Sequence, residues 1–441
     1  MSRVLCLGAG LVARPYIRYL SEHGYSVVVA SRTLKKAEQL IQGCGNAEAV
    51  AFDIDRDDRL LDKLTREADL VCSLLPYTYH VRAAKVAIRH RKHFCTTSYI
   101  SKEMQELNSA AEDAGIVLLN ECGVDPGIDH MSAMRIIHAA HRDGGKIESF
   151  TSFTGGLPAP DANNNPLGYK LSWSPRGVLL AGRNDAHFLL DGKEVVIPGS
   201  VLFDNCHLYE VPGLGVFEGY PNRDSMSYID IYGIPETKTM LRGTFRNTGW
   251  CNTMKRVSEL GLLDLTPRDL TNTTYAQMLS QLLGLKEQGL KSQVAHRLRV
   301  PITDPVITRL EWLGLFSSTR IPSEVSTPLD ALCHLFEEKL QYSPGERDMI
   351  VMHHDFVIRY PNRRQRLTST LIDYGIPHGE SSMSRTVSLP VAIASRMILE
   401  GSIKLVGVQR PVMPEIYGPV LEELESLGIT FTEQTSSVSA E

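Results

Sequence analysis

The chain has 441 residues, of which 43% are hydrophobic and 22% are charged. This composition is close to that of average folded proteins, and the length suffices for about three domains with sizeable cores, which excludes a disordered chain and a disulfide-dependent miniprotein. With 46 basic and 51 acidic residues the net charge is −5, so the chain lacks the basic footprint of a nucleic-acid-binding protein.

The first 125 residues alternate short apolar runs with segments of helical periodicity. We predict strands at 4–7, 26–30, 47–52, 69–75, 93–97 and 116–120. We predict helices at 11–23, 34–42, 79–90 and 101–114, the last with Ser101 as its N-cap and Gly115 at its end. This alternation predicts an α/β fold with a Rossmann-like, doubly wound parallel sheet.

The remaining residues predict a second sheet and a helical region. Further strands are predicted at 146–153, 195–197, 227–232, 238–245, 349–358, 368–374 and 429–432. Further helices are predicted at 131–142, 388–400 and 419–426, and the Leu-rich segment 251–342 is predicted to be mostly helical. The Gly-, Pro- and Asn-rich segment 155–165 predicts a loop, and residues 435–441 predict a disordered tail.

A glycine-rich turn falls between the first predicted strand and the first predicted helix. Gly8, Gly10 and Ala13 form the pattern G-x-G-x-x-A. In this pattern the first glycine permits a tight turn, the second lets the backbone approach a pyrophosphate, and the alanine allows the helix to pack closely. A glycine turn without a ligand is the alternative, but the preceding strand and following helix favour a dinucleotide site at the helix N-terminus.

The end of the second predicted strand distinguishes between the two nicotinamide dinucleotides. An NAD site places Asp or Glu there, on the ribose 2′-hydroxyl. This chain has Ser31, Arg32 and Thr33 instead, followed by Lys35 and Lys36. Because a guanidinium flanked by hydroxyls suits a 2′-phosphate, we expect NADP(H), the alternative being a solvated basic helix start.

Polar and aromatic residues follow three of the predicted strands. They are Tyr77 after the fourth strand, Ser98 and Tyr99 after the fifth, and the segment 122–130 after the sixth. In doubly wound folds the chemistry lies beyond these carboxyl ends. We expect no metal site, because the adjacent His353 and His354 would point to opposite faces of a strand.

Distinct sequence motifs are spread over nearly the whole chain. They lie at residues 98–101, 120–130, 155–160, 165–170, 172–177, 219–225, 242–244, 311–315, 347–349 and 416–419. Together they resemble the saccharopine reductases, the glutamate-forming, NADP-dependent saccharopine dehydrogenases. The resemblance implies a Rossmann domain at 1–124, completed by 388–441, and an all-α insertion at 251–342. It also implies a mixed α/β substrate-binding and dimerisation domain at 125–250 and 343–387.

The resemblance further implies which residues contact the ligands. The implied cofactor residues are Gly8, Ala9, Gly10, Leu11, Val12, Ser31, Arg32, Thr33, Asp53, Ile54, Leu75, Thr97, Ser98, Val124, Asp125, Pro126 and Ser174. The implied substrate residues are Ser98, Tyr99, Asp125, Arg223, Thr244, Phe245 and Arg246. Arginine forks suit a ligand with three carboxylates, although residue chemistry alone favours surface salt bridges, such as one between Arg223 and Asp224.

The implied activity is that of an oxidoreductase of lysine metabolism and amino-acid biosynthesis. It condenses L-2-aminoadipate 6-semialdehyde with L-glutamate to L-saccharopine through an imine that NADPH reduces, and it reverses this reaction. We predict that Tyr99 and Asp125 are catalytic, as proton shuttle and as stabiliser of the cationic iminium. Two alternatives stay open: an imine reductase of the carboxynorspermidine dehydrogenase type, and a catalytically silent NADP-binding regulator.

The cysteines and the apolar runs bear on the compartment. The eight cysteines form no CxxC pair, which fits reduced core residues better than a disulfide framework. No apolar run reaches the length of about 18 residues that a transmembrane helix needs, so we expect no membrane partner, and no nucleic-acid partner either. We expect a cytoplasmic homodimer, or a mitochondrial protein if the chain is part of a bifunctional animal-type protein.

Overall fold

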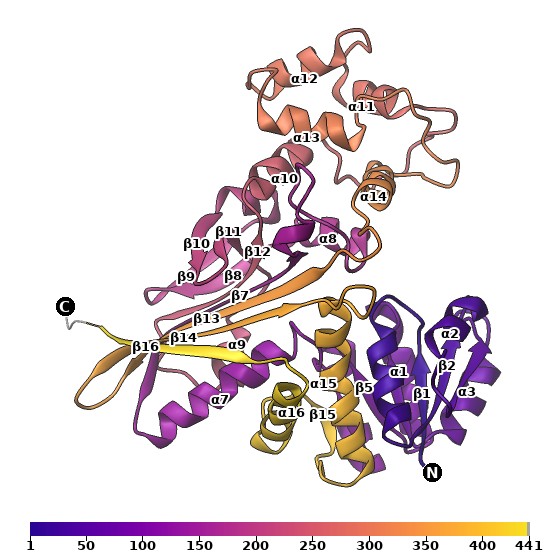
Figure 1. The fold of residues 1–441 in the computed structure, drawn as a ribbon, viewed down its shortest axis with the longest axis vertical. Coiled ribbons are helices and arrows are strands. Elements are labelled where there is room, and N and C mark those ends of the chain that lie inside the picture. Colours follow the sequence, from indigo (N-terminus) through magenta and orange to yellow (C-terminus); the bar gives the residue numbers. More distant parts are fainter. Residues whose placement is uncertain (439–441) are drawn as a thin grey trace. The chain divides into compact units, whose positions relative to one another are not determined.

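The computed structural model describes residues 1–438, which divide into two compact units. Unit 1 comprises Met1–Gly145 and Gly379–Thr432, and unit 2 comprises Lys146–His378 with the described part of Glu433–Glu441 (Figure 1). Each unit is built around its own sheet. The three-part division expected from the sequence, with a separate helical insertion, stays a prediction.

Unit 1 contains the parallel sheet that the sequence predicts. Its strands all pair in parallel, in the spatial order β3-β2-β1-β4-β5-β6-β15. They are β1 (Arg3–Leu7), β2 (Ser26–Ser31), β3 (Ala47–Ala51), β4 (Leu70–Ser73), β5 (His93–Thr96), β6 (Val117–Leu119) and β15 (Gly407–Gln409). The order reverses between β1 and β4, and ligands of doubly wound sheets bind at such a reversal.

Helices connect these strands. They are α1 (Ala13–Glu22), α2 (Leu34–Leu40), α3 (Asp58–Glu67), α4 (His80–Arg89) after the 3-10 turn η1 (Tyr77–Tyr79), α5 (Lys102–Gln105), α6 (Asn108–Ala114), α7 (Ile128–Arg142), α15 (Ser382–Leu399) and α16 (Pro414–Ser426). The apolar face of α1 is buried, and it packs against α15, where Tyr16 Oη and Ser395 Oγ are 3.1 Å apart. The C-terminal segment thus completes the unit that the N-terminal segment begins.

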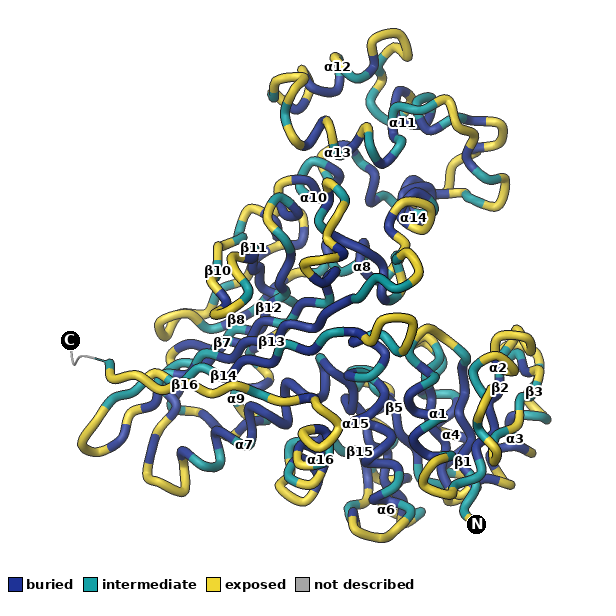
Figure 2. Tube along the Cα trace, viewed as in Figure 1, coloured by how far each residue is buried: buried dark blue, intermediate teal, exposed yellow. Residues whose placement is uncertain are grey.

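Unit 2 contains a mixed sheet in the order β10-β11-β12-β7-β13-β14-β16. Its long central strands are buried over most of their length (Figure 2). The strands are β7 (Lys146–Pro158), β10 (His207–Val211), β11 (Gly215–Pro221), β12 (Thr239–Arg246), β13 (Asp348–Arg359), β14 (Arg364–Tyr374) and β16 (Phe431–Ser437), with β8 (Ala186–Leu190) and β9 (Lys193–Ile197) attached to β12. β12 runs parallel to β7 and antiparallel to β11.

Most helices of unit 2 share one continuous apolar core with this sheet. The helices of unit 2 are α8 (Pro175–Ala181), the 3-10 segments η2 (Pro160–Ala162) and η3 (Gly199–Asp204), α9 (Ser227–Ile231), α10 (Trp250–Glu259), α11 (Tyr275–Leu283), α12 (Leu290–Arg297), α13 (Pro305–Leu313) and α14 (Pro328–Lys339). The segment 251–342 is mostly helical, as predicted. Within the described part of the chain, no helix is both long and apolar enough to cross a membrane.

Three predictions of local structure are wrong. Residues 227–232 form helix α9 instead of a strand, because the Asp224 carboxylate accepts hydrogen bonds from the amides of Met226 and Ser227 and starts a helix. The predicted loop at 155–165 begins too early, since β7 continues to Pro158 and pairs with β13. Its glycines serve packing, because a Cβ on Gly155 would lie 2.9 Å from Phe245 Cβ.

The third wrong prediction of local structure is the disordered tail at 435–441. β16 runs to Ser437 beside β14, and the Val438 amide donates to the Arg364 carbonyl over 3.0 Å. The strand arises because β14 would otherwise present an unpaired edge of backbone N–H and C=O groups. The last three residues of that prediction, 439–441, lie outside the described residues.

Candidate active-site residues

The glycine-rich turn after β1 has the geometry of a phosphate cradle. Gly8 has φ +112°, and a Cβ there would lie 2.9 Å from the Leu74 carbonyl oxygen. Gly10 is exposed, and a Cβ at that position would meet no atom within 4 Å. Gly8 is therefore required by the fold, whereas Gly10 leaves open space above the backbone.

The start of α1 fits the pyrophosphate of a dinucleotide. No side chain of the described residues caps this helix. The Ala13 amide already donates to the Gly10 carbonyl over 3.2 Å and Pro15 has no N–H, so the helix offers chiefly the positive end of its dipole to that open space. Ser388 of α15 donates a hydrogen bond to the Val12 carbonyl and braces the turn from behind. Of the other predicted residues in the turn, Leu11 is exposed and Ala9 is half-buried.

The residues predicted for the 2′-phosphate lie where β2 ends. The Thr33 amide donates to Ser31 Oγ over 3.3 Å. Arg32 is exposed and forms no ion pair with a described residue, so its guanidinium is available to a phosphate. After β3, Asp53 Oδ1 accepts the Asp55 amide at 3.0 Å, and Ile54 is buried beneath it.

Six of the predicted residues meet beyond the carboxyl ends of β5 and β6: Thr97, Ser98, Tyr99, Val124, Asp125 and Pro126. The Tyr99 hydroxyl donates to Asp125 Oδ1 over 3.1 Å, and both side chains are half-buried. The turn is tight, since a Cβ on Gly123 would lie 3.1 Å from Thr97 Cβ. The predicted catalytic pair is therefore a hydrogen-bonded pair. Leu75 follows β4 and is half-buried.

Sequence reasoning missed His80, which lies at the start of α4. Its Nδ1 is 2.9 Å from Ser73 Oγ, and its Nε2 is 2.8 Å from Ser98 Oγ and 3.2 Å from Thr96 Oγ1. Burial lowers the pKa of His80 to about 4, so the ring is neutral at physiological pH. His80 fixes the hydroxyl of Ser98, and no motif around it signals this role.

A buried charge network that the sequence also failed to predict supports the Ser98–Tyr99 turn. Glu121 adopts φ +55°, and its Oε1 accepts hydrogen bonds from the Ile100 amide and from Arg410 Nε, both 3.0 Å long. His130 Nε2 is 3.0 Å from Oε2. Burial alone raises the pKa of Glu121, but the hydrogen bond and charge of His130, with the charge of Arg410, bring it down to about 2.

In unit 2, the predicted residues Thr244, Phe245 and Arg246 end strand β12. Arg246 is 5% exposed. Its guanidinium lies over the rings of Tyr169 and Trp250, 5.2 and 5.5 Å from their centroids. Nη1 donates to the Phe245 carbonyl over 2.8 Å, but Nε has no partner, and no described carboxylate pairs with this cation. A buried cation without a counter-ion is costly, which indicates a site for an anion.

Other polar atoms of unit 2 are likewise buried without a hydrogen-bond partner among the described residues. They include Thr154 Oγ1, Tyr169 Oη, Ser172 Oγ, Trp250 Nε1 and Tyr342 Oη, together with Arg256 Nε and Ser369 Oγ. Buried polar groups of folded proteins are normally satisfied. Two of these atoms belong to the rings that contact Arg246, so the deficit points to a polar, anionic ligand at the same place.

The positions of the two remaining predicted residues, Arg223 and Ser174, do not by themselves indicate a ligand site. Arg223 is exposed with φ +54°, and its carbonyl accepts the His187 amide at 2.8 Å. Ser174 caps α8 by accepting the Gly177 amide at 3.3 Å. Both belong to unit 2 with Arg246, whereas Tyr99, Asp125 and the glycine-rich turn belong to unit 1.

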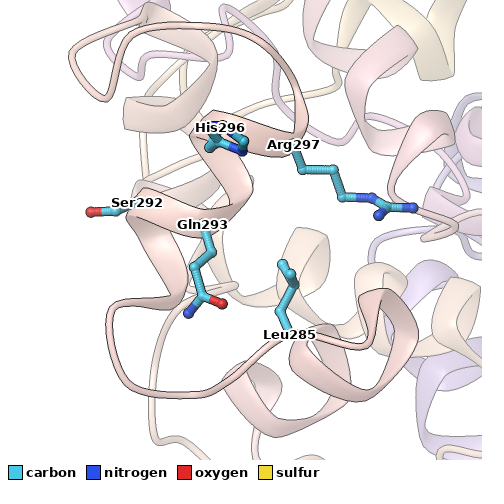
Figure 3. Close-up of a pocket in the computed structure, with 5 residues that line it drawn as sticks. All are labelled: Leu285, Ser292, Gln293, His296 and Arg297. Atoms are coloured by element: carbon cyan, nitrogen blue, oxygen red, sulfur yellow. The ribbon is translucent and has the colours of Figure 1, made fainter.

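A cavity of about 450 Å³ lies elsewhere in unit 2, along α12. Figure 3 shows its lining: Leu285, Ser292, Gln293, His296 and Arg297. Gln293 Nε2 donates to the carbonyls of Lys286 and Gln288, both at 2.9 Å, and so closes the loop between α11 and α12. None of the residues predicted for cofactor or substrate lines this cavity.

Comparison with known proteins adds an independent observation. Residues 4–119 match the family model described as the saccharopine dehydrogenase NADP binding domain, and residues 123–429 match the saccharopine dehydrogenase C-terminal domain. Together these matches cover the glycine-rich turn, the Tyr99–Asp125 pair and Arg246.

Full-length relatives are similar along the whole chain. A saccharopine dehydrogenase [NADP(+), L-glutamate-forming] of Schizosaccharomyces pombe is 42% identical over 98% of this chain and 99% of its own length. The bovine mitochondrial alpha-aminoadipic semialdehyde synthase is 40% identical, but the match spans 48% of that longer protein.

A solved structure is similar to this chain over its whole length. The apo saccharopine dehydrogenase (L-Glu forming) of Saccharomyces cerevisiae matches with a TM-score of 0.89 at 40% identity, over 99% of this chain and 100% of that chain. The predicted NADP(H) cofactor and oxidoreductase class are confirmed by these relatives and by the family model. The chain therefore belongs to the saccharopine dehydrogenase family, as an NADP-dependent oxidoreductase.

Proposed function

We propose that this chain is a saccharopine reductase of lysine metabolism. It condenses L-2-aminoadipate 6-semialdehyde with L-glutamate to L-saccharopine through an imine, and it catalyses the reverse reaction. The observation that carries the proposal is Arg246, a buried guanidinium with an unpaired Nε and no described counter-ion. The full-length relatives named for this reaction support it.

The residues proposed to bind the cofactor are those whose positions suit the phosphate groups of NADP(H). Gly8, Gly10 and the first turn of α1 would hold the pyrophosphate, and Ser31, Arg32 and Thr33 would hold the 2′-phosphate. Bound NADPH supplies the hydride for the imine carbon. The chain contributes binding, orientation and charge.

The Tyr99–Asp125 pair has the chemistry that imine formation and reduction require. Asp125 presents a carboxylate that stabilises a cationic iminium, and its hydrogen bond to Tyr99 offers a path for a proton. Because an unperturbed tyrosine has a pKa of about 10, Tyr99 is a weak base by itself, and water relays the proton through the pair. His80 holds Ser98 beside it.

Arg246 would bind one substrate carboxylate through its guanidinium fork. Arg223, which is exposed, would bind a second one. This demand for carboxylates disfavours the alternative of a carboxynorspermidine-type imine reductase, whose substrate has fewer. The buried Arg246 also disfavours the second alternative, because a catalytically silent NADP-binding regulator needs no group that binds a substrate carboxylate.

The proposal is tested by the absorbance of NADPH. Purified chain is mixed with NADP⁺ and L-saccharopine at alkaline pH, with carboxynorspermidine in a parallel reaction and a Tyr99→Phe variant as control. We expect an absorbance rise with saccharopine that is much slower in the variant. Faster turnover of carboxynorspermidine would establish the alternative reductase, and no rise with either compound would establish a silent protein.

Assembly and compartment are separate proposals that rest on family resemblance. We propose a homodimer formed through the sheet domain of unit 2, and residence in the cytoplasm, or in the mitochondrion if the chain is part of a longer animal-type protein. Light scattering of the eluting protein measures its mass. A mass equal to one chain at micromolar concentration would contradict the dimer.

A further inference from the structure

Three candidate metal ligands from separate elements converge in unit 2. The Sγ atoms of Cys206 and Cys251 and a carboxylate oxygen of Glu218 all lie within 4.8 Å of one another. Cys206 joins η3 to β10, Glu218 lies in β11, and Cys251 is the second residue of α10. Because the three residues are far apart in sequence, no spacing motif signals the cluster.

The fold brings these elements together independently of any ligand. β10 pairs with β11 so that His207 lies opposite Gly219, which places Cys206 at the same end of the strand pair as Glu218. η3 packs against α10, which lies beside β10 and β11 (Figure 1). Cys251 is 2% exposed, whereas Cys206 and Glu218 are half-buried, so the cluster is accessible from one side.

The Glu218 carboxylate is held in place before any ion arrives. Its Oε1 accepts the Gly249 amide at 2.7 Å, and its Oε2 accepts the Cys251 amide at 2.8 Å. Each carboxylate oxygen has a second lone pair, so both can bind a cation as well. Such fixation of a ligand by its surroundings is typical of built metal sites.

The donor atoms of the cluster decide which cation it suits. A cation that binds thiolates must displace the thiol protons of Cys206 and Cys251, so binding weakens as pH falls. Thiolate donors exclude Mg²⁺ and Ca²⁺ and favour Zn²⁺.

We propose that Cys206, Glu218 and Cys251 form a Zn²⁺ site with three protein ligands, the fourth position being open to water or another small ligand. Zn²⁺ with this donor set leaves one net negative charge on the site. The bound ion would tie the η3–β10 connection to the start of α10, next to Arg246 and Trp250.

The test uses the full chain, purified without a metal-binding tag and stripped with a chelator, and Co²⁺ as a spectroscopic probe. We expect one Co²⁺ per chain, with thiolate-to-cobalt charge-transfer bands that Zn²⁺ abolishes by displacement. The variants Cys206→Ser and Cys251→Ser should weaken binding by about 100-fold or more, because each loses a direct ligand. The matched controls Cys44→Ser, half-buried, and Cys333→Ser, buried, should bind as the parent does.

A second measurement does not depend on whether the variants fold. Zn²⁺ should slow alkylation of Cys206 and Cys251 in the parent protein, with Cys44 as the internal reference, as measured by mass spectrometry. Absence of charge-transfer bands, equal binding by all variants, or loss of both thiols to a disulfide in protein handled without reductant would overturn the proposal. None of these outcomes bears on saccharopine oxidation, so the two proposals fail separately.

Discussion

Arg246 is the residue on which the proposed substrate site depends. Its guanidinium is removed from water, stacked on Tyr169 and Trp250, and has Nε unpaired. In a closed protein core this arrangement would cost several kcal/mol. A carboxylate of the substrate would offset the cost when it binds.

We expect Arg246→Ala to raise the KM for saccharopine roughly 10- to 100-fold, because a hydrogen bond to a charged group is worth about 1.5–3 kcal/mol. Binding of NADP⁺, measured by fluorescence titration, should not change. Arg359→Ala is the control, since that cation is already paired with Glu148 over 2.8 Å. A normal KM in the Arg246 variant would remove the carboxylate assignment.

The two glycines of the dinucleotide turn should respond differently to the same substitution. Gly8→Ala forces a side chain into φ +112° and against Leu74, so the melting temperature should fall along with NADPH affinity. Gly10→Ala meets no atom, so the melting temperature should hold while the new methyl group obstructs the pyrophosphate. Equal effects of both variants on stability would contradict this division.

His80 should make stability depend on pH. Its pKa is about 4 in the folded protein and about 6.5 in the unfolded chain. The unfolded chain therefore binds a proton first, and as pH falls from 6.5 to 4 roughly 3 kcal/mol of stability is lost. Urea unfolding across that range should show a shallower fall for His80→Asn than for the parent, and parallel curves would refute the assignment.

Candidate site residues can be named from the sequence where their chemistry is local, and their roles stay predictions. The glycine pattern, Ser31–Thr33, and the Tyr99 and Asp125 motifs each fall within a few residues, and the structure bonds Tyr99 to Asp125. His80 and Arg410 were not predictable, because their partners Ser98 and Glu121 come from distant positions. A single sequence does not encode such pairings in any local pattern.

At the scale of elements, the parallel strands of unit 1 were predicted well because each is a short apolar run between helical segments. Errors arose where a local pattern was ambiguous. The mix of Tyr, Ile and Asp in 227–231 indicates a strand, but the Asp224 carboxylate accepts the amides of Met226 and Ser227 and turns the chain into a helix. Likewise Gly155 indicates a loop, but its missing side chain makes room for Phe245.

The sequence did not predict strand β15, because its three residues are too few to show a periodic pattern. It nevertheless pairs with β6 and carries Val408 into the core of unit 1. Removing residues 406–441 should abolish NADPH binding and lower the melting temperature, although every predicted cofactor residue lies upstream. Unchanged affinity in the shortened chain would show that unit 1 is complete without this strand.

At the scale of the whole molecule, overall charge does not attract the ligands. The chain carries −5, and both NADPH and a tricarboxylate are anionic. We therefore expect the attraction to be local, at the groups proposed to bind these ligands: Arg32, the start of α1 and Arg246.

Unit 1 is discontinuous, and this has a consequence for biosynthesis. The ribosome makes β1 to β6 first and β15, α15 and α16 last, with all of Lys146–His378 in between. The nascent cofactor unit thus waits with its β6 edge and the buried face of α1 uncovered until α15 and β15 have been made. Unit 1 therefore completes its fold only after unit 2 has been synthesised, and that interval is when the nascent chain most needs a chaperone.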